Sequence, residues 1–333
     1  MIKNLLLLSF IISFNFNYAQ NNYLDSDGID DYVNVTNSDN ILADATSITM
    51  SCKVFPRRIS SGFPNFNGFL GYRNESNFDF YLIQLSSTDL EARFRNSNGV
   101  AYSITYTGLV LNQWTQFFLV YNGTSGTLKL YSGATEVSSV LASGVAPSSS
   151  TGTFKIGLVT YQTFNWYHDG KIDETSLWNK ALSPTEISAI VNNSGEIQNP
   201  LSETNLKLYY KFNQGIPYGN NTSITSVTDE LALHNGMVLN FGLTGNSSNW
   251  GSDTLGLNQM NTTHQLVYPN PAHDYISISG ITEPTTVKIV DISGRIILTE
   301  TLLNEDSKLN ISSLNAGIYL LSTANSSIKF IKN

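Results

Sequence analysis

The fold of this chain is decided by the stretch Gly170-Lys-Ile-Asp-Glu-Thr-Ser-Leu-Trp-Asn-Lys-Ala-Leu-Ser-Pro-Thr-Glu-Ile187. Gly170 breaks the chain direction, and residues 171 to 178 then alternate as a β-strand. One face of this strand carries Ile172, Glu174, Ser176 and Trp178, and the other carries Lys171, Asp173, Thr175 and Leu177. We expect the side with Asp173, Thr175 and Leu177 to point at the protein core.

The second half of the stretch predicts a short helix. Ser183 suits the N-cap, Pro184 suits the first helical position, and Glu186 completes a capping box with Ser183. One face of the helix then carries Ile187, Ile190 and Val191. A strand that leads into a short capped helix is not in itself an active-site signature.

The same stretch resembles the closing segment of laminin-G-like, concanavalin A-like jelly-roll modules. The family's opening segment is matched by Leu24-Asp-Ser-Asp-Gly-Ile-Asp-Asp-Tyr-Val-Asn-Val35, and the predicted hairpin at 114–132 resembles the middle. The resemblance covers about residues 21 to 195 and implies two antiparallel sheets packed face to face. Abundant Gly, Ser, Thr and Asn, without long helical periodicity, also favour an all-β fold.

The region after the helix has strand character of its own. Leu206, Leu208, Tyr210 and Phe212 alternate with polar or aromatic neighbours, which predicts a half-buried strand. Residues 201–250 either complete the sandwich or form the stub of a second copy, and the sequence supports both. We therefore place the jelly-roll domain at residues 20–250, with its core at 21–195.

The C-terminal part is predicted to be a separate domain. Residues 251–265 contain no core pattern, which is typical of a linker. They precede Val267-Tyr-Pro-Asn-Pro-Ala-His-Asp-Tyr-Ile-Ser-Ile278, Val287-Lys-Ile-Val-Asp-Ile-Ser-Gly-Arg295, Leu314-Asn-Ala-Gly-Ile-Tyr-Leu-Leu321 and Lys329-Phe-Ile-Lys332. This order resembles the type A C-terminal sorting domain of the Bacteroidetes type IX secretion system over residues 266–333. The resemblance implies a small Ig-like β-sandwich, an interaction with the type IX machinery, removal of this domain, and release or lipopolysaccharide anchoring of the rest.

The N-terminus is typical of a secretory signal peptide. Lys3 precedes an apolar run at residues 5–16, and we expect cleavage after Ala19. The run is too short to span a bilayer comfortably, so the mature chain is expected to have no transmembrane span. These features predict a secreted or extracellular cell-surface protein that travels through the periplasm.

Composition excludes some partners and predicts the state of the one cysteine. The 333 residues carry a net charge of -8 with only 13% charged residues, so nothing suggests the electrostatic footprint of a nucleic-acid-binding protein. Cys52 is the only cysteine and alternates with Met50 and Val54. It is therefore expected to be a small buried hydrophobe rather than a nucleophile or half of an intramolecular disulfide.

A structural calcium site is one hypothesis for the carboxylates. A buried Asp173 needs a partner, because an isolated buried carboxylate would be neutralised by a pKa shift. If the first and last strands are neighbours, the loop that contains Asp25, Asp27 and the carbonyl of Gly28 can meet Asp173. Such an oxygen set suits calcium, and the family resemblance implies a calcium there. The alternative is that Asp173 accepts hydrogen bonds from backbone amides without metal.

Aromatic residues are the candidates for ligand binding. Trp166 and Tyr167, with His168 beside them, precede Gly170, so we expect them in an exposed loop where they can stack on a sugar ring. His168 is expected to be a ligand or proton donor there, or else simply solvated. Trp114 and Trp178 are expected to be core residues, because aromatics dominate the cores of β-sandwiches.

No catalytic motif is present, so the sequence favours a binding protein over an enzyme. Neither HExxH, GxSxG, a P-loop nor CxxC occurs. Asp173 and Glu174 are adjacent, which predicts side chains on opposite faces and no acid/nucleophile pair. We predict a protein for adhesion or carbohydrate recognition that binds a glycan or a cell-surface protein. The alternatives are a polysaccharide-degrading enzyme or its accessory carbohydrate-binding module, and a structural surface protein with no small ligand.

Overall fold

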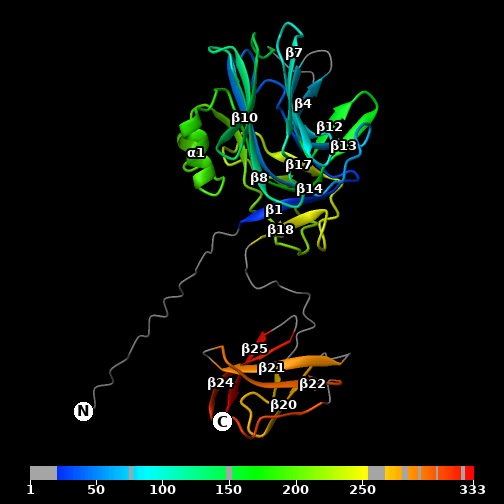
Figure 1. The fold of residues 1–333 in the computed structure, drawn as a ribbon, viewed down its shortest axis with the longest axis vertical. Helices are drawn as coiled ribbons and strands as arrows, with labels where there is room; N and C mark the ends of the chain where they lie inside the picture. The colour runs from blue at the N-terminus through cyan, green and yellow to red at the C-terminus, as the bar shows by residue number, and fades with distance from the viewer. Residues whose placement is uncertain are drawn as a thin grey trace, which may run out of the picture. The chain divides into compact units, whose positions relative to one another are not determined.

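The chain forms two compact units, Met1–Thr254 and Leu255–Asn333 (Figure 1). The structure is a computed structural model that describes residues 21–74, 78–147, 152–253, 267–279, 284–291, 294–304, 307–323 and 327–333. The predicted signal peptide at 1–19 and most of the predicted linker lie outside the described residues. Nearly all the regular structure is β-strand, which confirms the expected all-β class.

The first unit contains two large sheets, and we name the eight-stranded sheet that holds the first strand sheet A. Its order is β10 (Thr135–Leu141), β9 (Thr127–Ser132), β8 (Thr115–Asn122), β3 (Ser47–Pro56), β14 (Asp169–Trp178), β1 (Asn22–Asp27) and β18 (Asn249–Ser252), and β15 (Leu206–Tyr210) also pairs with β14. β1 and β14 are antiparallel neighbours. The opening and closing segments of the jelly roll therefore meet, as expected.

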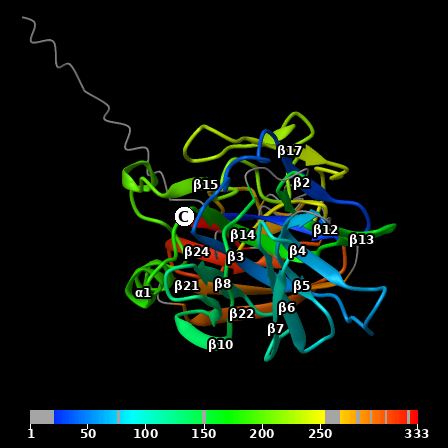
Figure 2. The same cartoon turned by 90° about the horizontal axis from the view of Figure 1, so that it is seen from above.

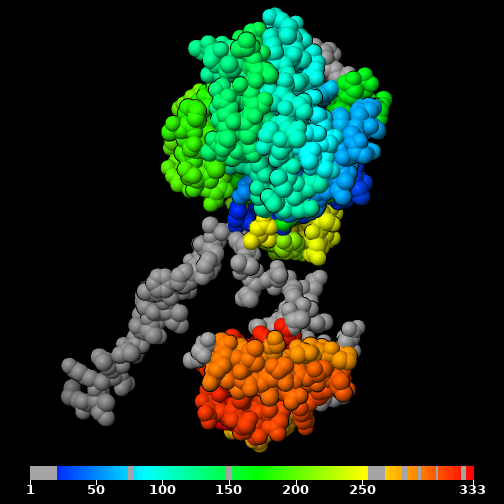
Figure 3. All heavy atoms as spheres, in the orientation of Figure 1, coloured from blue at the N-terminus to red at the C-terminus, as the bar shows by residue number. Residues whose placement is uncertain are grey.

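The second large sheet, sheet B, also has eight strands. Its order is β16 (Ser226–Val227), β17 (Gly236–Leu239), β2 (Tyr32–Val35), β11 (Lys155–Ile156), β4 (Asn67–Asn74), β5 (Phe78–Gln84), β6 (Asp89–Arg95) and β7 (Ala101–Thr107). The neighbouring strands β4 to β7 lie side by side in Figure 2 and contribute to the surface of the unit in Figure 3.

Side chains from the inner faces of the two sheets form one hydrophobic core. In β6, for example, Leu90, Ala92 and Phe94 are buried and alternate with half-buried polar residues. Cys52 is 0% exposed within this core, which confirms its predicted role as a buried hydrophobe.

Residues 201–250 complete the sandwich rather than begin a second copy. β15 pairs with β14 and β18 pairs with β1, so both extend sheet A. β17 pairs with β2, and β16 pairs with β17 at the edge of sheet B. The sequence left this point open, because strand pairing at such separations depends on the assembled fold.

β14 contains an irregularity that changes the faces of its residues. Ile172 and Leu177 both belong to the inner core, although residues five positions apart face opposite sides of a regular strand. The register with β3 shifts between Asp173 and Ser176, and Glu174 has φ 46°. The prediction that Asp173 and Leu177 share a core-facing side is therefore wrong. Asp173 lies on the outer face of sheet A.

The helix α1 (Pro184–Asn192) covers part of that outer face, as Figure 1 shows beside β8 and β10. Its predicted capping box is confirmed, because the Ser183 side chain accepts from the backbone N–H of Glu186 while the Glu186 carboxylate accepts from the backbone N–H of Ser183. Ile187 is fully buried against outer-face rings that include Trp178. The short 3-10 helix η1 (Pro200–Ser202) follows.

A two-stranded hairpin covers part of the outer face of sheet B. It consists of β12 (Leu158–Tyr161) and β13 (Phe164–Tyr167), and it lies against β4 (Figures 1 and 2). Val159 and Trp166 from the hairpin pack against Tyr81 and Ile83 of β5. The two outer faces of the sandwich thus have different covers.

The second unit contains two small sheets with their own core, and it is a body of its own in Figure 3. The three-stranded sheet has the order β19 (Val267–Tyr268), β20 (Tyr275–Ile278), β23 (Leu309–Asn310), and the four-stranded sheet has the order β22 (Ile296–Leu302), β21 (Thr285–Asp291), β24 (Gly317–Ser322), β25 (Ser327–Lys332). Val287 and Ile289 are buried in the core of this unit, as their alternation predicts. Ala272 bridges Lys332 in parallel, so the first and last segments of this unit meet.

Candidate functional site

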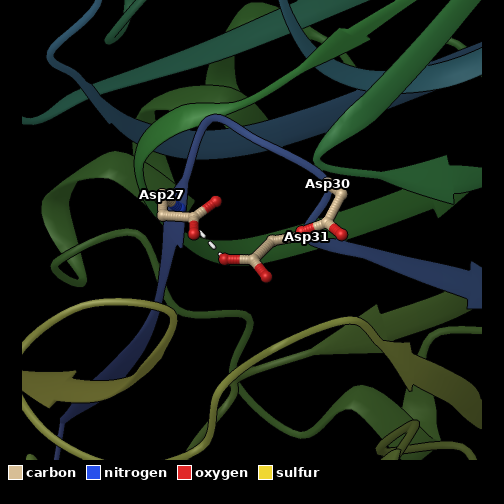
Figure 4. A group of neighbouring side chains, drawn as sticks. All are labelled: Asp27, Asp30 and Asp31. Carbon is tan, nitrogen blue, oxygen red and sulfur yellow. Dashed lines mark hydrogen bonds between the residues drawn. The ribbon is translucent and has the colours of Figure 1, made fainter.

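An acidic loop between β1 and β2 brings three carboxylates together. Oxygens of Asp27, Asp30 and Asp31 lie within 4.8 Å of one another (Figure 4). Asp31 is 0% exposed, and its two oxygens accept from the backbone N–H of Asp27 at 3.0 Å and the hydroxyl of Ser248 at 2.9 Å. The loop is therefore folded around the buried carboxylate of Asp31.

The electrostatics of this loop favour an added positive charge. The pKa of Asp31 is raised to about 7, mainly by burial and also by the charges of Asp27 and Asp30, although its two hydrogen bonds act against this shift. A divalent cation beside these carboxylates would offset both the cost of burying the charge of Asp31 and the repulsion between the three carboxylates. The donors are all oxygens, which is the chemistry that calcium prefers.

The calcium ligands expected from the sequence do not meet. Asp27 pairs in register with Asp169, and Asp173 lies four residues farther along β14, about 13 Å away at the rise of a strand. Asp25 instead accepts two hydrogen bonds from the guanidinium of Arg57, at 2.7 and 2.8 Å. Of the predicted metal-binding carboxylates, only Asp27 belongs to the acidic cluster.

The carbonyl of Gly28 also has a different partner from the one expected. It accepts a hydrogen bond from the guanidinium of Arg58 at 2.7 Å. Arg58 thus places a permanent positive charge at the loop. The expectation that Asp173 joins Asp27 in one ligand set is therefore wrong, and Asp25 and the carbonyl of Gly28 each accept hydrogen bonds from an arginine.

Asp173 and Glu174 form a buried acidic pair on the outer side of sheet A. They are 2% and 1% exposed. Burial raises the pKa of Asp173 well above its usual range, and the neighbouring charge of Glu174 adds to this. Burial also raises the pKa of Glu174 to about 7, although its carboxylate accepts a hydrogen bond from the hydroxyl of Tyr209. The segment after α1 is linked to this pair through Tyr209, because the same hydroxyl accepts a buried hydrogen bond from the backbone N–H of Ile197 at 3.0 Å.

Trp166 does not provide the exposed ring that the sequence predicted. It is 4% exposed, and its indole N–H donates to the carbonyl of Pro64 at 3.0 Å. Its ring packs edge-on against Phe66 with centroids 4.9 Å apart. The expectation of loop exposure is wrong because β13 pairs with β12 and turns this side chain toward sheet B. The stacking role stays a prediction that the buried ring does not support.

Tyr167 and His168 also lie in unexpected surroundings. Tyr167 is half-buried with its ring 6.3 Å from that of Tyr32. His168 is 0% exposed and its Nε2 lies 3.2 Å from the carbonyl oxygen of Lys171. Burial lowers the pKa of His168 to about 3, so the ring is neutral at neutral pH and cannot act as a proton donor from an imidazolium. Neither the solvated nor the proton-donating expectation for His168 fits.

The two tryptophans expected in the core behave differently. Trp178 is 2% exposed, which confirms the prediction. Trp114 is half-buried, packs against Tyr23 and Phe55 with ring centroids 5.5 and 5.7 Å apart, and donates from its indole N–H to Asp253. Trp114 therefore presents part of its ring at the surface of the first unit.

The sequence analysis missed a group of cations on the outer face of sheet B. The members of this group are Arg73, Arg93, Arg95 and Lys155. Asp79 is 0% exposed and lies 3.1 Å from Arg93 and 2.9 Å from Arg95. Asp89-Leu-Glu-Ala-Arg-Phe-Arg95 was an available signal, because charged residues alternate with apolar ones along β6. Only the pairing of β4, β5, β6 and β11 brings the whole group together.

Comparisons with known families agree with the geometry of both units. Residues 27–188 match the family model of the concanavalin A-like lectin/glucanases superfamily. Residues 266–333 match the family model of the secretion system C-terminal sorting domain. No curated protein sequence matched the chain. Within the described residues, no helix has the length and apolar character needed to cross a membrane.

Solved structures with a similar fold are distant in sequence. A Bacteroides ovatus protein to which carbohydrate binding is attributed is 20% identical, with a TM-score of 0.49 over 66% of this chain and 58% of that chain. A heptameric SAP-like pentraxin from Limulus polyphemus is 15% identical, with a TM-score of 0.41 over 52% of this chain and 82% of that one. The CBM40 module of a Ruminococcus gnavus sialidase is 14% identical, with a TM-score of 0.40 over 51% and 97%. Residues 27–188 are thus similar to the concanavalin A-like lectin/glucanases superfamily, and residues 266–333 are similar to the secretion system C-terminal sorting domain.

Proposed function

We propose that this chain is an exported glycan-binding protein that acts in adhesion or carbohydrate recognition outside the cell. The observation that carries the proposal is the combination of a lectin/glucanase-type sandwich with a sorting domain in one chain. The sorting domain implies export and a cell-surface or secreted location. Many displayed copies would supply avidity to a weak single site.

The carboxylates support binding rather than polysaccharide hydrolysis. A glycosidase needs an acid and a second carboxylate that both reach the scissile bond. Asp173 and Glu174 are almost fully buried, and Asp31 holds the acidic loop together through two hydrogen bonds. Within the described residues, neither group offers an exposed acid/base pair in which both carboxylates are free to act. The burial and the hydrogen bonds of these carboxylates therefore favour binding over hydrolysis.

We further propose that a calcium ion binds at the acidic loop. Asp27, Asp30 and Asp31 supply the converging oxygens, and the buried Asp31 gains most from a cation. The loop joins β1 to β2 and so links sheet A to sheet B. Calcium here has a structural role and takes no part in a reaction.

A glycan array tests the binding function. The purified full chain is expected to bind a limited set of glycans, and a signal that grows with surface density would reflect avidity. Failure to bind any glycan on an array of plant, animal and microbial structures, with the protein shown to be folded by circular dichroism, would refute the function.

Intact-mass analysis of culture and surface fractions tests the export route. The exported protein is expected to lack residues 1–19 and most of 266–333. Deletion of residues 328–332, which removes most of β25, should keep the protein inside the cell, because that strand closes the four-stranded sheet of the sorting domain. Recovery of exported protein with an intact C-terminus would contradict processing of this kind.

A further inference from the structure

The outer face of sheet B carries a row of residues with a gap in it. Lys155 pairs in register with Gly71, Gly71 with Tyr81, and Tyr81 with Arg93. Residues paired in register point to the same side of a sheet. Ile156, the neighbour of Lys155, is buried in the inner core, so this row faces outward. Gly71 has no side chain in this row, and a small space lies beside it and Lys155.

That space is a small polar cavity beneath the start of the β12–β13 hairpin. Its volume is about 30 Å³, and its side-chain lining includes Arg73, Lys155, Thr153 and Thr160. Gly71 forms part of the floor, and a Cβ there would lie 2.3 Å from the carbonyl oxygen of Phe80. A single water needs about 10–15 Å³ by the same kind of measure. The cavity therefore accepts one small polar group, whereas a whole sugar ring does not fit. We name it the anion cavity.

The charge of the anion cavity is not compensated by the residues around it. No carboxylate lines it, and among the described residues no carboxylate forms an ion pair with Arg73 or Lys155. The Nε of Arg73 is buried and has no hydrogen-bond partner within the described part of the chain. Burial lowers the pKa of Lys155, which reports the cost of holding its charge there.

Arg73 makes its closest contacts with aromatic rings, although two acids lie on the same face: Asp79 pairs with Arg73 in register, and Glu91 accepts a hydrogen bond from the hydroxyl of Tyr81. Its guanidinium carbon lies 4.8 Å from the ring centroid of Tyr81 and 4.6 Å from that of Tyr161, and it also donates to the Tyr81 hydroxyl. The neighbouring cations differ in this respect, because Arg93 and Arg95 share the buried Asp79. Arg73 and Lys155 line one small space that no carboxylate of the described residues lines, and such a space suits an anionic group.

We propose that the anion cavity binds the negatively charged substituent of a saccharide, a carboxylate or a sulfate ester, while the sugar ring remains at the surface. The proposal rests on the glycan-binding function proposed above and names the class of glycan. Arg73 and Lys155 supply the charge, and the hydroxyls of Thr153 and Thr160 are the neutral hydrogen-bonding groups of the lining. A bound anion would compensate two cations for which no described carboxylate forms an ion pair.

The experiment compares matched acidic and neutral saccharides on the full chain by isothermal titration calorimetry. Oligogalacturonate is compared with its methyl ester, and dextran sulfate with dextran. At least one acidic member is expected to bind about tenfold or more tightly than its neutral partner, and added salt should weaken it. The two pairs distinguish a carboxylate from a sulfate ester as the preferred group.

Three variants assign the effect to the cavity. Lys155→Gln is expected to lower affinity for the acidic saccharide about tenfold and to leave the neutral partner unchanged, whereas Lys155→Arg should retain most of the affinity. Lys129→Gln is the matched control, because Lys129 lies on sheet A and pairs with Glu136 at 2.8 Å. Thermal unfolding checks that each variant is folded.

Each outcome decides the proposal. Equal affinity for acidic and neutral saccharides would overturn the anion cavity while the glycan-binding function stands. If Lys129→Gln lowers the affinity for the acidic saccharide as much as Lys155→Gln does, the anion cavity is also refuted, because the effect would then come from the overall charge of the protein. Binding of the neutral saccharides without binding of either acidic one refutes the anion cavity only. No binding to these saccharides or to any glycan on the array refutes both proposals.

Discussion

The two outer faces of the sandwich both carry charged side chains, but different segments pack over them. On sheet A, α1 and the segment after it seal Asp173 and Glu174, which are 2% and 1% exposed. On sheet B, the β12–β13 hairpin buries Trp166 but leaves Arg73 and Lys155 at a cavity. Along strands of both sheets, polar residues alternate with apolar ones. Alternation therefore tells which side chains leave the core, whereas the covering segments decide which of them remain available to a ligand.

The largest expected effects come from removing the tryptophan ring in the contact between each sheet and the segment that packs on its outer face. Trp178→Ala and Trp166→Ala should each lower the free energy of unfolding by about 3 to 5 kcal/mol, because each leaves a large buried cavity. Denaturant unfolding measures both. Phe63→Ala is the control, since Phe63 is 57% exposed near the same hairpin, and its cost should stay near 0.5 kcal/mol. If Trp166→Ala costs no more than Phe63→Ala, the hairpin is a loose cover and the comparison fails.

The next effect concerns the sealed acids on sheet A. The pKa of Glu174 is raised from 4.5 to about 7, so the folded protein keeps a proton that the unfolded chain loses. The corresponding stability is complete below pH 4.5 and is lost as the pH rises to about 7, a change of about 3 kcal/mol. Glu174→Gln should reduce this dependence, and the part that remains would come from Asp173 and Asp31, whose pKa values burial also raises.

Denaturant unfolding between pH 4.5 and 8, with chelator present, measures this slope. Glu186→Gln is the control, because hydrogen bonds from Lys180 and Ser183 help to hold the pKa of Glu186 below its usual value. That variant should leave the loss of stability above pH 5 unchanged. A wild-type protein that grows more stable between pH 5 and 7 would show that the seal on sheet A admits water or a cation.

The effect of calcium on thermal stability should show whether the metal binds at the acidic loop or at the acids on sheet A. At a hundred times its dissociation constant, calcium would stabilise the fold by about 2.7 kcal/mol, which is about 5 to 10 °C in melting temperature. Asp27→Asn and Asp30→Asn should abolish the shift, and Asp173→Asn should preserve it. Differential scanning calorimetry with calcium and with chelator measures this. Loss of the shift in Asp173→Asn alone would move the metal to sheet A.

The smallest effect is expected at Trp114, which has no covering segment. Lys171 lies 5.8 Å from the centroid of its ring and 4.3 Å from that of Tyr23, so the ring belongs to a surface cation–aromatic group. Trp114→Ala should cost about 1 to 2 kcal/mol in denaturant unfolding, less than Trp178→Ala. An equal cost for the two variants would place Trp114 in the core.

The local elements were predictable because their signals are local. The strand at 171–178, the capping box at Ser183 and the buried Cys52 follow from spacing and residue type within a few positions. The two domain resemblances also depend on short motifs with a fixed order along the chain. Each of these features is decided by neighbours in sequence, so the sequence alone contains the information.

The candidate site was not predictable in the same way, because it depends on register and on covering segments. One irregularity at Glu174 moves Asp173 to the outer face of sheet A, and pairing in β13 buries Trp166. Contacts between residues far apart in the sequence then determine which charged groups are compensated. Arg57, for example, binds Asp25 through two hydrogen bonds.

The sequence by itself determined the all-β class, the two domain types and most of the strands and the helix near the closing segment. Only the tertiary structure decided that three aspartates of the opening loop converge, and that Arg73 and Lys155 line one cavity that no described carboxylate lines. The physical reason is that side-chain alternation has a period of two along one strand and carries no record of which strand lies beside it. Charges become a site only when the pairing of strands and the segment above them fix which of those charges are compensated.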